Sequence, residues 1–210
     1  MIAGILEGKT TPTIVEVTLA FDEFAVSTRP NTSYGWAIRS TRPQVPSNEA
    51  KREKINGLLS LDLVTGKEYL KLELVAKTEN IANYFVNLSF DLLQDHPQLQ
   101  TINIFVDNNP THKKKLQALI KDKIQELYKT KNIQNTNDLP TINFFYFAPY
   151  SPDDNPVEYD IRIIRQLCLH HLPLNTTLKQ LASQLQTKIQ NQQFMTQTKL
   201  QNILKHIFTL

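Results

Sequence analysis

Three carboxylates stand where the sequence predicts the end of a strand or the start of a helix. Asp22 ends a β-branched run that begins at residue 14. Asp107 ends an apolar run that begins at residue 101, and Glu158 follows a proline-rich turn. If the two strands are neighbours, both aspartates emerge at one edge of the sheet, where α/β proteins place their sites. Mg²⁺ prefers carboxylate oxygens and keeps several waters, so a few acids suffice to hold two cations. Two cations about 4 Å apart activate water or a 3′-OH and stabilise the leaving oxygen. The three acids therefore predict metal-dependent cleavage of a phosphodiester.

The segment 147–158 would hold its last residue in a fixed place. Its prolines stiffen the turn, and Ser-Pro and Asn-Pro steps favour turn initiation. Asn155 can cap a helix and Pro156 fits the first turn, which places Glu158 about one turn into that helix. A structural alternative stays open, because Glu158 can complete a capping box with Asn155 or pair with Arg162 one turn later.

The two aspartates also have alternatives. Asp107 opens the sequence Asp-Asn-Asn-Pro, which is favourable turn chemistry. Glu23 competes with Asp22, because only one of two successive strand residues faces a given side of a sheet. Our interpretation takes Asp22 and Asp107 as the site residues.

The segments that would position these acids alternate between strand and helix patterns. Strands are predicted over residues 14–22, 55–64, 68–75, 101–107 and 142–147, with a short strand or hairpin arm at 34–40. Helices are predicted over 80–95, 111–128, 156–170, 177–190 and 196–208. Residues 41–54 and 129–140 are predicted to be loops. This order indicates an α/β fold, a mixed sheet with helices packed on it.

Composition narrows the class of protein. Cys168 is the single cysteine, so an internal disulfide and a cysteine-based zinc site are excluded. Its apolar neighbours predict a core position. The apolar runs are too short to cross a membrane, and only five glycines argue against a glycine-rich phosphate loop. These features predict a cytoplasmic protein.

The C-terminal part differs from the rest in charge. No acid follows Asp160, and residues 161–210 carry a net charge of +6, whereas residues 1–160 carry −3. This part is also rich in Gln and Asn. Such a stretch suits contacts to nucleic-acid phosphates, and it equally suits solvated helix faces. We predict one domain over residues 1–172 and a basic, amide-rich helical tail over 173–210.

Three blocks of the sequence resemble the acidic blocks of a known family. They are Phe-Asp-Glu at 21–23 with the stretch 29–37, the apolar strand and Asp-Asn within 104–113, and the turn 149–158. In this order they are similar to bacterial insertion-sequence transposases of the mariner-type superfamily. The resemblance spans about residues 14–170.

The resemblance implies an RNase H-like fold, which is a mixed five-stranded sheet flanked by helices, here with a C-terminal helical extension. It implies a DDE triad of Asp22, Asp107 and Glu158 that binds two Mg²⁺ or Mn²⁺ ions. The implied activity is nicking of double-stranded DNA at transposon ends and strand transfer into target DNA, in this family at TA sites. Residues 1–172 would then be the catalytic domain of a nucleoid-associated protein that forms a homodimer on DNA.

The sequence departs from the family's pattern in three respects. Asp154 stands where the family has an apolar residue, and 50 residues separate Asp107 from Glu158, more than the usual interval. The family's N-terminal helix-turn-helix modules have no counterpart here, because the first strand begins near residue 14. We therefore expect a separate helix-turn-helix half or a shortened fragment. The alternative functions are an inactive, DNA-binding or regulatory protein and another RNase H-like nuclease.

Six other side chains are candidate contacts to DNA, each with a structural alternative. Trp36 can stack on a base, although a lone tryptophan is more often part of a core. His112 can contact a phosphate or be polar surface, and the lysine run from residue 113 can follow the DNA backbone or be a solvated face. The candidates are Trp36, His112, Lys113, Lys114, Arg162 and Arg165.

Overall fold

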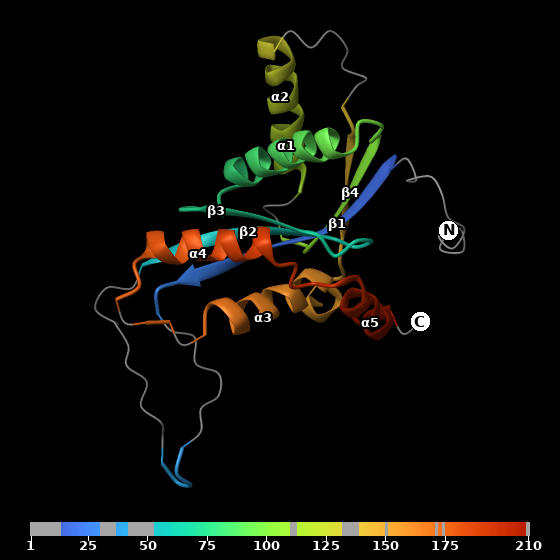
Figure 1. Ribbon diagram of the computed structural model, residues 1–210. Coiled ribbons are helices and arrows are strands. Elements are labelled where there is room, and N and C mark those ends of the chain that lie inside the picture. The colour runs from blue at the N-terminus through green and yellow to red at the C-terminus, as the bar shows by residue number, and fades with distance from the viewer. Residues whose placement is uncertain are drawn as a thin grey trace.

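The structure is a computed structural model that describes residues 14–29, 37–41, 53–109, 113–131, 139–149, 151–170, 172–173 and 175–208. Its centre is a five-stranded sheet with the order β3-β2-β1-β4-β5 (Figure 1). The strands are β1 (Glu16–Ser27), β2 (Lys54–Asp62), β3 (Glu68–Glu73), β4 (Thr101–Val106) and β5 (Thr141–Tyr146). β2 is antiparallel to β1 and β3, whereas β1, β4 and β5 run parallel. The predicted mixed sheet is thus confirmed.

Helices cover both faces of this sheet. α1 (Thr78–Asp95) and α2 (Lys114–Lys131) lie on one face, and α3 (Pro156–Cys168), α4 (Leu178–Asn191) and α5 (Gln197–Phe208) lie on the other (Figure 1). Alternation along β1 explains the two layers, since successive strand residues point to opposite faces. Leu19 and Phe21 belong to the core with α1 and α2, whereas Ala20 and Phe24 belong to the core with α3, α4 and α5.

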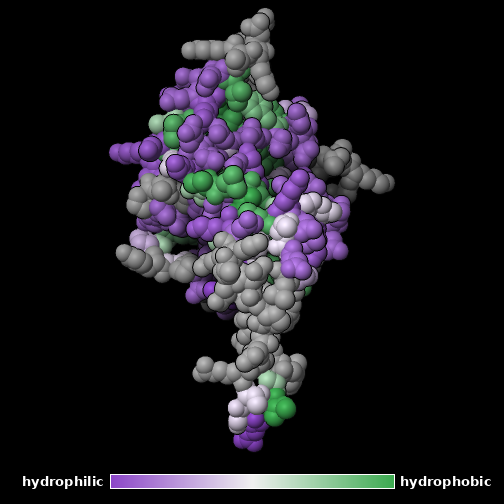
Figure 2. Space-filling model, turned by 90° about the vertical axis from the view of Figure 1, so that its left-hand side faces the viewer, coloured by the Kyte–Doolittle hydropathy of each residue, from purple (hydrophilic) through white to green (hydrophobic). Residues whose placement is uncertain are grey.

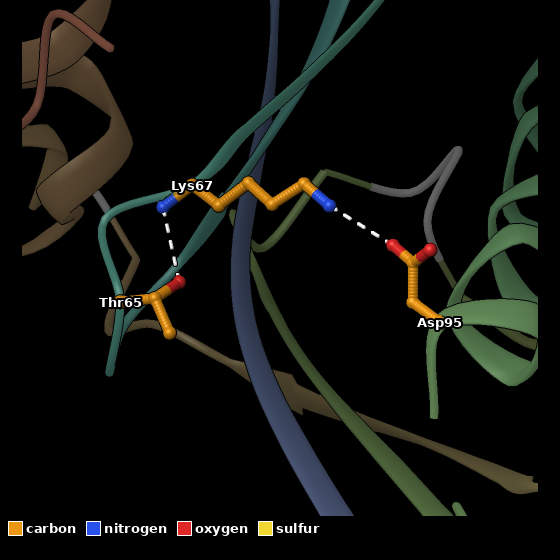
Figure 3. A network of polar contacts seen from close by, with 3 residues as sticks. All are labelled: Thr65, Lys67 and Asp95. Carbon is orange, nitrogen blue, oxygen red and sulfur yellow. Dashed lines mark hydrogen bonds and ion pairs between the residues drawn. The ribbon is translucent and has the colours of Figure 1, made fainter. Parts of the chain in front are cut away.

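The predicted hairpin between β2 and β3 is confirmed, and its turn is fixed by side-chain hydrogen bonds. Asp62 Oδ1 accepts from the N–H groups of Val64 (2.7 Å) and Thr65 (3.1 Å). The Lys67 N–H donates to Thr65 Oγ1, and Lys67 Nζ lies 2.9 Å from Asp95 Oδ2 at the end of α1 (Figure 3). The hairpin is therefore tied to the helix that follows it.

The predicted end of the first strand at Asp22 is wrong. β1 continues to Ser27, because β2 still pairs with it after its pairing with β4 has ended at Ala20. Asp22 therefore lies inside a strand, held by an antiparallel neighbour on one side. A single-sequence pattern could not give this length, since the continuation depends on a strand that comes later in the chain.

Two smaller expectations also differ from the structure. Within the predicted arm 34–40, the described residues 37–41 form a turn in which the Thr41 N–H donates to the Ile38 carbonyl (2.9 Å). α2 continues to Lys131, beyond its predicted end at residue 128.

Most apolar side chains lie inside the molecule, and one face of its surface is mainly hydrophilic. Figure 2 views the molecule from the left of Figure 1 and shows a mainly hydrophilic face with a small apolar patch near its middle. No helix among the described residues is long and apolar enough to cross a membrane.

Candidate active site

Asp22 faces the side of the sheet on which α3 lies. Ala20 and Phe24 stand two residues before and after it, and both belong to the core with α3. Because strand side chains alternate, Asp22 points to this side and Glu23 to the other. Ala20 pairs in register with Phe105 of β4, and Asp107 follows two residues later. The two aspartates therefore come together at the carboxyl end of β4, as the sequence predicts for neighbouring strands.

Glu158 reaches the same place from the start of α3. Asn155 caps this helix, and its Oδ1 accepts from the Val157 N–H (3.3 Å). Pro156 occupies the first turn, where a missing N–H costs no hydrogen bond. The Asn155 side chain thus accepts from the N–H of Val157. The N–H of Glu158 donates to the Asn155 backbone carbonyl instead (3.1 Å).

Asn155 also joins this helix to β1, a role that the sequence interpretation missed. Its side chain is buried, and its Nδ2 donates to the Phe21 carbonyl (3.3 Å) and to Asp22 Oδ2 (3.4 Å). One amide thus holds the end of the loop, the start of the helix and a carboxylate together. The sequence signal for Asn155 predicted only the cap, because a cap pattern contains no information about a strand far away in the chain.

The three predicted acids line one cleft of about 660 Å³. Its walls come from the ends of β4 and β5, the middle of β1 and the start of α3. Glu23 and Asp154 are not among the described residues that line it. The lining residues are Asp22, Asp107, Asn108, Asn109, Lys113, Phe147, Ala148, Pro149, Ser151, Asn155 and Glu158.

The cleft has an excess of negative charge. Burial first, and then the nearby charges of Glu158 and Asp107, raise the pKa of Asp22 to about 7, against a hydrogen bond from the Glu23 N–H (2.7 Å) that lowers it. Without a cation, Asp22 therefore keeps its proton to a higher pH than an ordinary aspartate. A bound divalent cation would offset both the burial and the repulsion.

The donor set fits Mg²⁺ or Mn²⁺. It offers three carboxylates and no thiol or imidazole among the described lining residues, and hard cations of this kind prefer oxygen. Within the described part of the chain, no group of three or more His, Cys, Asp or Glu side chains is gathered closely enough to hold one metal ion. The acids therefore share a cleft without converging on a single point.

The other predicted residues occupy different surroundings. Lys113 lines the cleft, and Lys114 is exposed at the start of α2. Arg162 is exposed on α3 with its guanidinium 5.5 Å from the centre of the Tyr159 ring, and Arg165 is half-buried in the last turn of that helix. Trp36 and His112 lie outside the described residues.

The chain is similar to known proteins over most of its length. Residues 17–182 match the family described as DDE superfamily endonuclease. No curated protein matches the sequence.

Several solved structures are similar in fold. The Mos1 mariner paired end complex with Mn has a TM-score of 0.62 at 14% identity, over 90% of this chain and 52% of that one. The same complex with Mg has a TM-score of 0.60 at 15% identity, over 92% of this chain and 55% of that one. The catalytic domain of Mos1 mariner transposase has a TM-score of 0.54 at 14% identity, over 90% of this chain and 76% of that one. This chain thus spans about half the length of the paired-end relatives. The likeness shows an RNase H-like fold, as the sequence predicts.

Proposed function

Because this chain belongs to the DDE superfamily of endonucleases, we propose that it is the catalytic part of a transposase that cuts DNA at transposon ends and joins them to target DNA. The observation that carries the proposal is the cleft in which Asp22, Asp107 and Glu158 meet from three separate elements. Asp107 Oδ1 also accepts from the Asn109 N–H (3.3 Å), so this acid contributes to its turn as well. Turn formation and capping, however, do not require acids from a strand interior, a strand end and a helix start to line one cleft. This arrangement suits a site for cations and a phosphodiester.

Each lining residue has a part in this proposal. Asp22 and Asp107 would share the two cations, and Glu158 would hold the second. When bound, the cations supply activation of water or a 3′-OH and stabilisation of the leaving oxygen. Asn155 orients the Asp22 carboxylate through its Nδ2. Lys113 is the one basic residue among the described lining residues, and it would hold the phosphate in place.

The partners follow from the same proposal. The similar structures are named as transposase complexes with transposon ends and as a strand transfer complex. We propose double-stranded DNA as the substrate, with TA target sites, and a homodimer on DNA. The proposal also includes a helix-turn-helix part as a further partner. An origin in a bacterial insertion sequence remains part of this proposal.

Substitution of the acids tests the function. The substrate is a DNA duplex that carries the element's ends, read from the flanking genomic sequence, and nicking is measured with Mg²⁺ and with Mn²⁺. Asp107→Asn and Glu158→Gln should slow nicking about 10³-fold or more, because each removes a cation ligand whose effect amounts to several kcal/mol.

Glu23→Gln is the matched control, since Glu23 neighbours Asp22 but faces the other side of β1. It should nick at the parental rate. If the Asp107 or Glu158 variant also nicks at the parental rate, the proposed active site is wrong. If the parent does not nick in the presence of its helix-turn-helix part, the inactive regulatory alternative is favoured.

A further inference from the structure

Three phenylalanines form a continuous row on the sheet face that carries the candidate site. Phe105 of β4 and Phe145 of β5 pair in register, and their rings stack with centroids 5.1 Å apart and an interplanar angle of 22°. Phe147, just after β5, lies 5.7 Å from the Phe105 ring at an angle of 36°. We call Phe105, Phe145 and Phe147 the phenylalanine row.

The row lies on an incompletely covered part of the sheet. Phe145 is 44% exposed, although it is a large apolar residue within a strand. Its neighbours Ile142 and Phe144 pack against the core with α1 and α2, whereas Phe145 belongs to neither core. Because β5 is the last strand of the sheet, the face of Phe145 is open to the side as well.

The row leads directly into the candidate active site. Phe147 lines the cleft together with Asp107 and Glu158. Phe105 precedes Asp107 by two residues, so the alternation of β4 carries both toward the same side. The exposed ring of Phe145 is thus joined to the acidic cleft through two further rings.

A row of amides runs beside the rings. Asn103 and Asn143 pair in register two residues before Phe105 and Phe145, and Asn143 Nδ2 donates to Asn103 Oδ1 (3.1 Å). Asn103 Nδ2 in turn donates to the Glu16 carboxylate. Stacked rings beside amide groups are the surface chemistry by which sheets recognise nucleobases, whose faces stack on aromatic rings and whose edges form hydrogen bonds. An aliphatic groove would suit a lipid or an apolar peptide, whereas the described side chains of this row are aromatic and those beside it are amides.

From this geometry we infer that the phenylalanine row is a stacking platform for an unpaired base of the DNA strand that enters the cleft. The base must be unpaired, since neighbouring base pairs cover both faces of a base within a duplex. Phe145 receives the base, Phe105 supports its ring, and Phe147 connects Phe105 to the cleft. The inference rests on the proposed function for the source of the strand, but the stacking itself needs no cleavage.

Binding of single-stranded DNA tests the platform. The affinity of the full 210-residue chain for a fluorescein-labelled dT15 oligomer is measured by fluorescence anisotropy without divalent cations. Phe145→Ala should weaken binding about 5- to 100-fold, the effect of losing one base–aromatic stack. Phe145→Leu should weaken it similarly because it keeps apolar volume without an aromatic face, and Phe145→Tyr should bind like the parent. Phe208→Ala is the matched control, because Phe208 is 52% exposed on α5.

An abasic oligomer of the same length separates stacking from phosphate binding. The parent and the Phe145→Ala variant should bind it equally weakly. The inference is overturned if Phe145→Ala binds dT15 like the parent, or if it weakens binding to the abasic oligomer to the same extent. It is also overturned if sedimentation shows a change of oligomeric state without a change in dT15 affinity, since the face would then be a contact between copies of this chain. Because the assay involves no cation and no cleavage, its failure leaves the carboxylate test of the proposed function intact.

Discussion

At the scale of single residues, Asn155 and Asp22 show how a helix cap can become part of a site. The same side chain that accepts from Val157 donates to Asp22 and to the Phe21 carbonyl. Asn155 is buried, so breaking these hydrogen bonds would leave its amide without partners. That would cost about 1–3 kcal/mol of folding free energy, and the link is therefore rigid. The Asp22 carboxylate thereby acquires a fixed orientation before any ligand binds.

Two substitutions of Asn155 separate the cap from the link to Asp22. Asn155→Ser retains a cap oxygen but is too short to reach Asp22, whereas Asn155→Ala loses both functions. We expect the melting temperature of the Ala variant to lie about 3–10 °C below that of the parent. The melting temperature of the Ser variant should decrease clearly less. Both variants should nick DNA about 10- to 100-fold more slowly, because both lose a hydrogen bond to a carboxylate.

Thermal unfolding followed by circular dichroism and the nicking assay check this prediction together. A Ser variant that nicks like the parent would show that Asn155 serves only the helix. Equal losses of melting temperature in the two variants would show that the cap contributes little.

At the scale of elements, the order and type of every long strand and helix could be predicted from periodicity. The alternation of Leu70 and Leu72 with Lys71 predicts the hairpin strand, since one side of a strand faces a core. The length of β1 could not be predicted, because it depends on pairing with β2. Asp107 and Glu158 could be selected because a strand end and a proline-rich turn have strong local signals, whereas Asp22 was selected at a strand end that the structure does not have. The bridge from Asn155 to β1 and the row of Phe105 and Phe145 depend on which strands become neighbours.

The helix α3 carries a second acid whose surroundings no local pattern indicates. Asp160 of α3 is fully buried, and burial followed by the charge of Glu68, in β3, raises its pKa to about 9. Glu68 accepts hydrogen bonds from the N–H groups of Phe194 (3.1 Å) and Met195 (3.2 Å), just before α5. Neither oxygen of the Asp160 carboxyl has a hydrogen-bond partner among the described residues. The charge that acts on Asp160 therefore comes from the carboxylate of β3 that holds the approach to α5.

This pair predicts a stability that decreases with pH. In the unfolded chain Asp160 ionises near pH 4, whereas in the folded protein it stays protonated up to about pH 9. As the pH rises between these values, the unfolded state is progressively favoured. Asp160→Asn removes this titration. We compare the difference in melting temperature, variant minus parent, at two pH values. This difference should be larger at pH 8 than at pH 5 by about 5 °C or more.

Melting curves of the parent and of this variant at pH 5, 6, 7 and 8 measure the effect. Asp154→Asn is a suitable control, since Asp154 is only half-buried in the turn before α3. A difference in melting temperature between the Asp160 variant and the parent that is the same at every pH would contradict the prediction.

At the scale of the whole molecule, the C-terminal helices are packed as part of the second core. The boundary predicted at residue 172 stays a prediction, but the helices beyond it share a buried surface with β1, β2 and α3. Gln193 Nε2 donates to the Thr65 carbonyl of the β2–β3 turn (2.9 Å). A side chain on Gly66 would place its Cβ only 2.4 Å from the Met195 carbonyl oxygen, so the turn and this segment lie in direct contact.

This packing predicts that the chain cannot fold without its last two helices. The apolar side chains that they and the preceding segment bury each contribute about 1.5–3 kcal/mol, and together they approach the whole stability of a typical domain. They are Leu181, Leu185, Phe194, Met195 and Leu200. We expect a chain truncated after residue 172 to lose its cooperative thermal transition and to bind the dye ANS, because the parts of β2 and β3 that α4 covers would face water.

A pair of point substitutions gives the same test within the intact chain. Leu185→Ala removes a fully packed side chain of α4 and should lower the free energy of unfolding by about 2–5 kcal/mol. Gln184 is the exposed neighbour of Leu185, and Gln184→Ala should change the free energy of unfolding by about 0.5 kcal/mol or less. If the truncated chain instead melts cooperatively within a few degrees of the parent, the helices are an appendage on a self-sufficient domain. In that case their positive charge would be their main contribution. If it fails to fold, the acid-free segment holds in place the sheet face from which Asp22 projects, and any contact it makes with DNA is made by a surface of the catalytic domain itself.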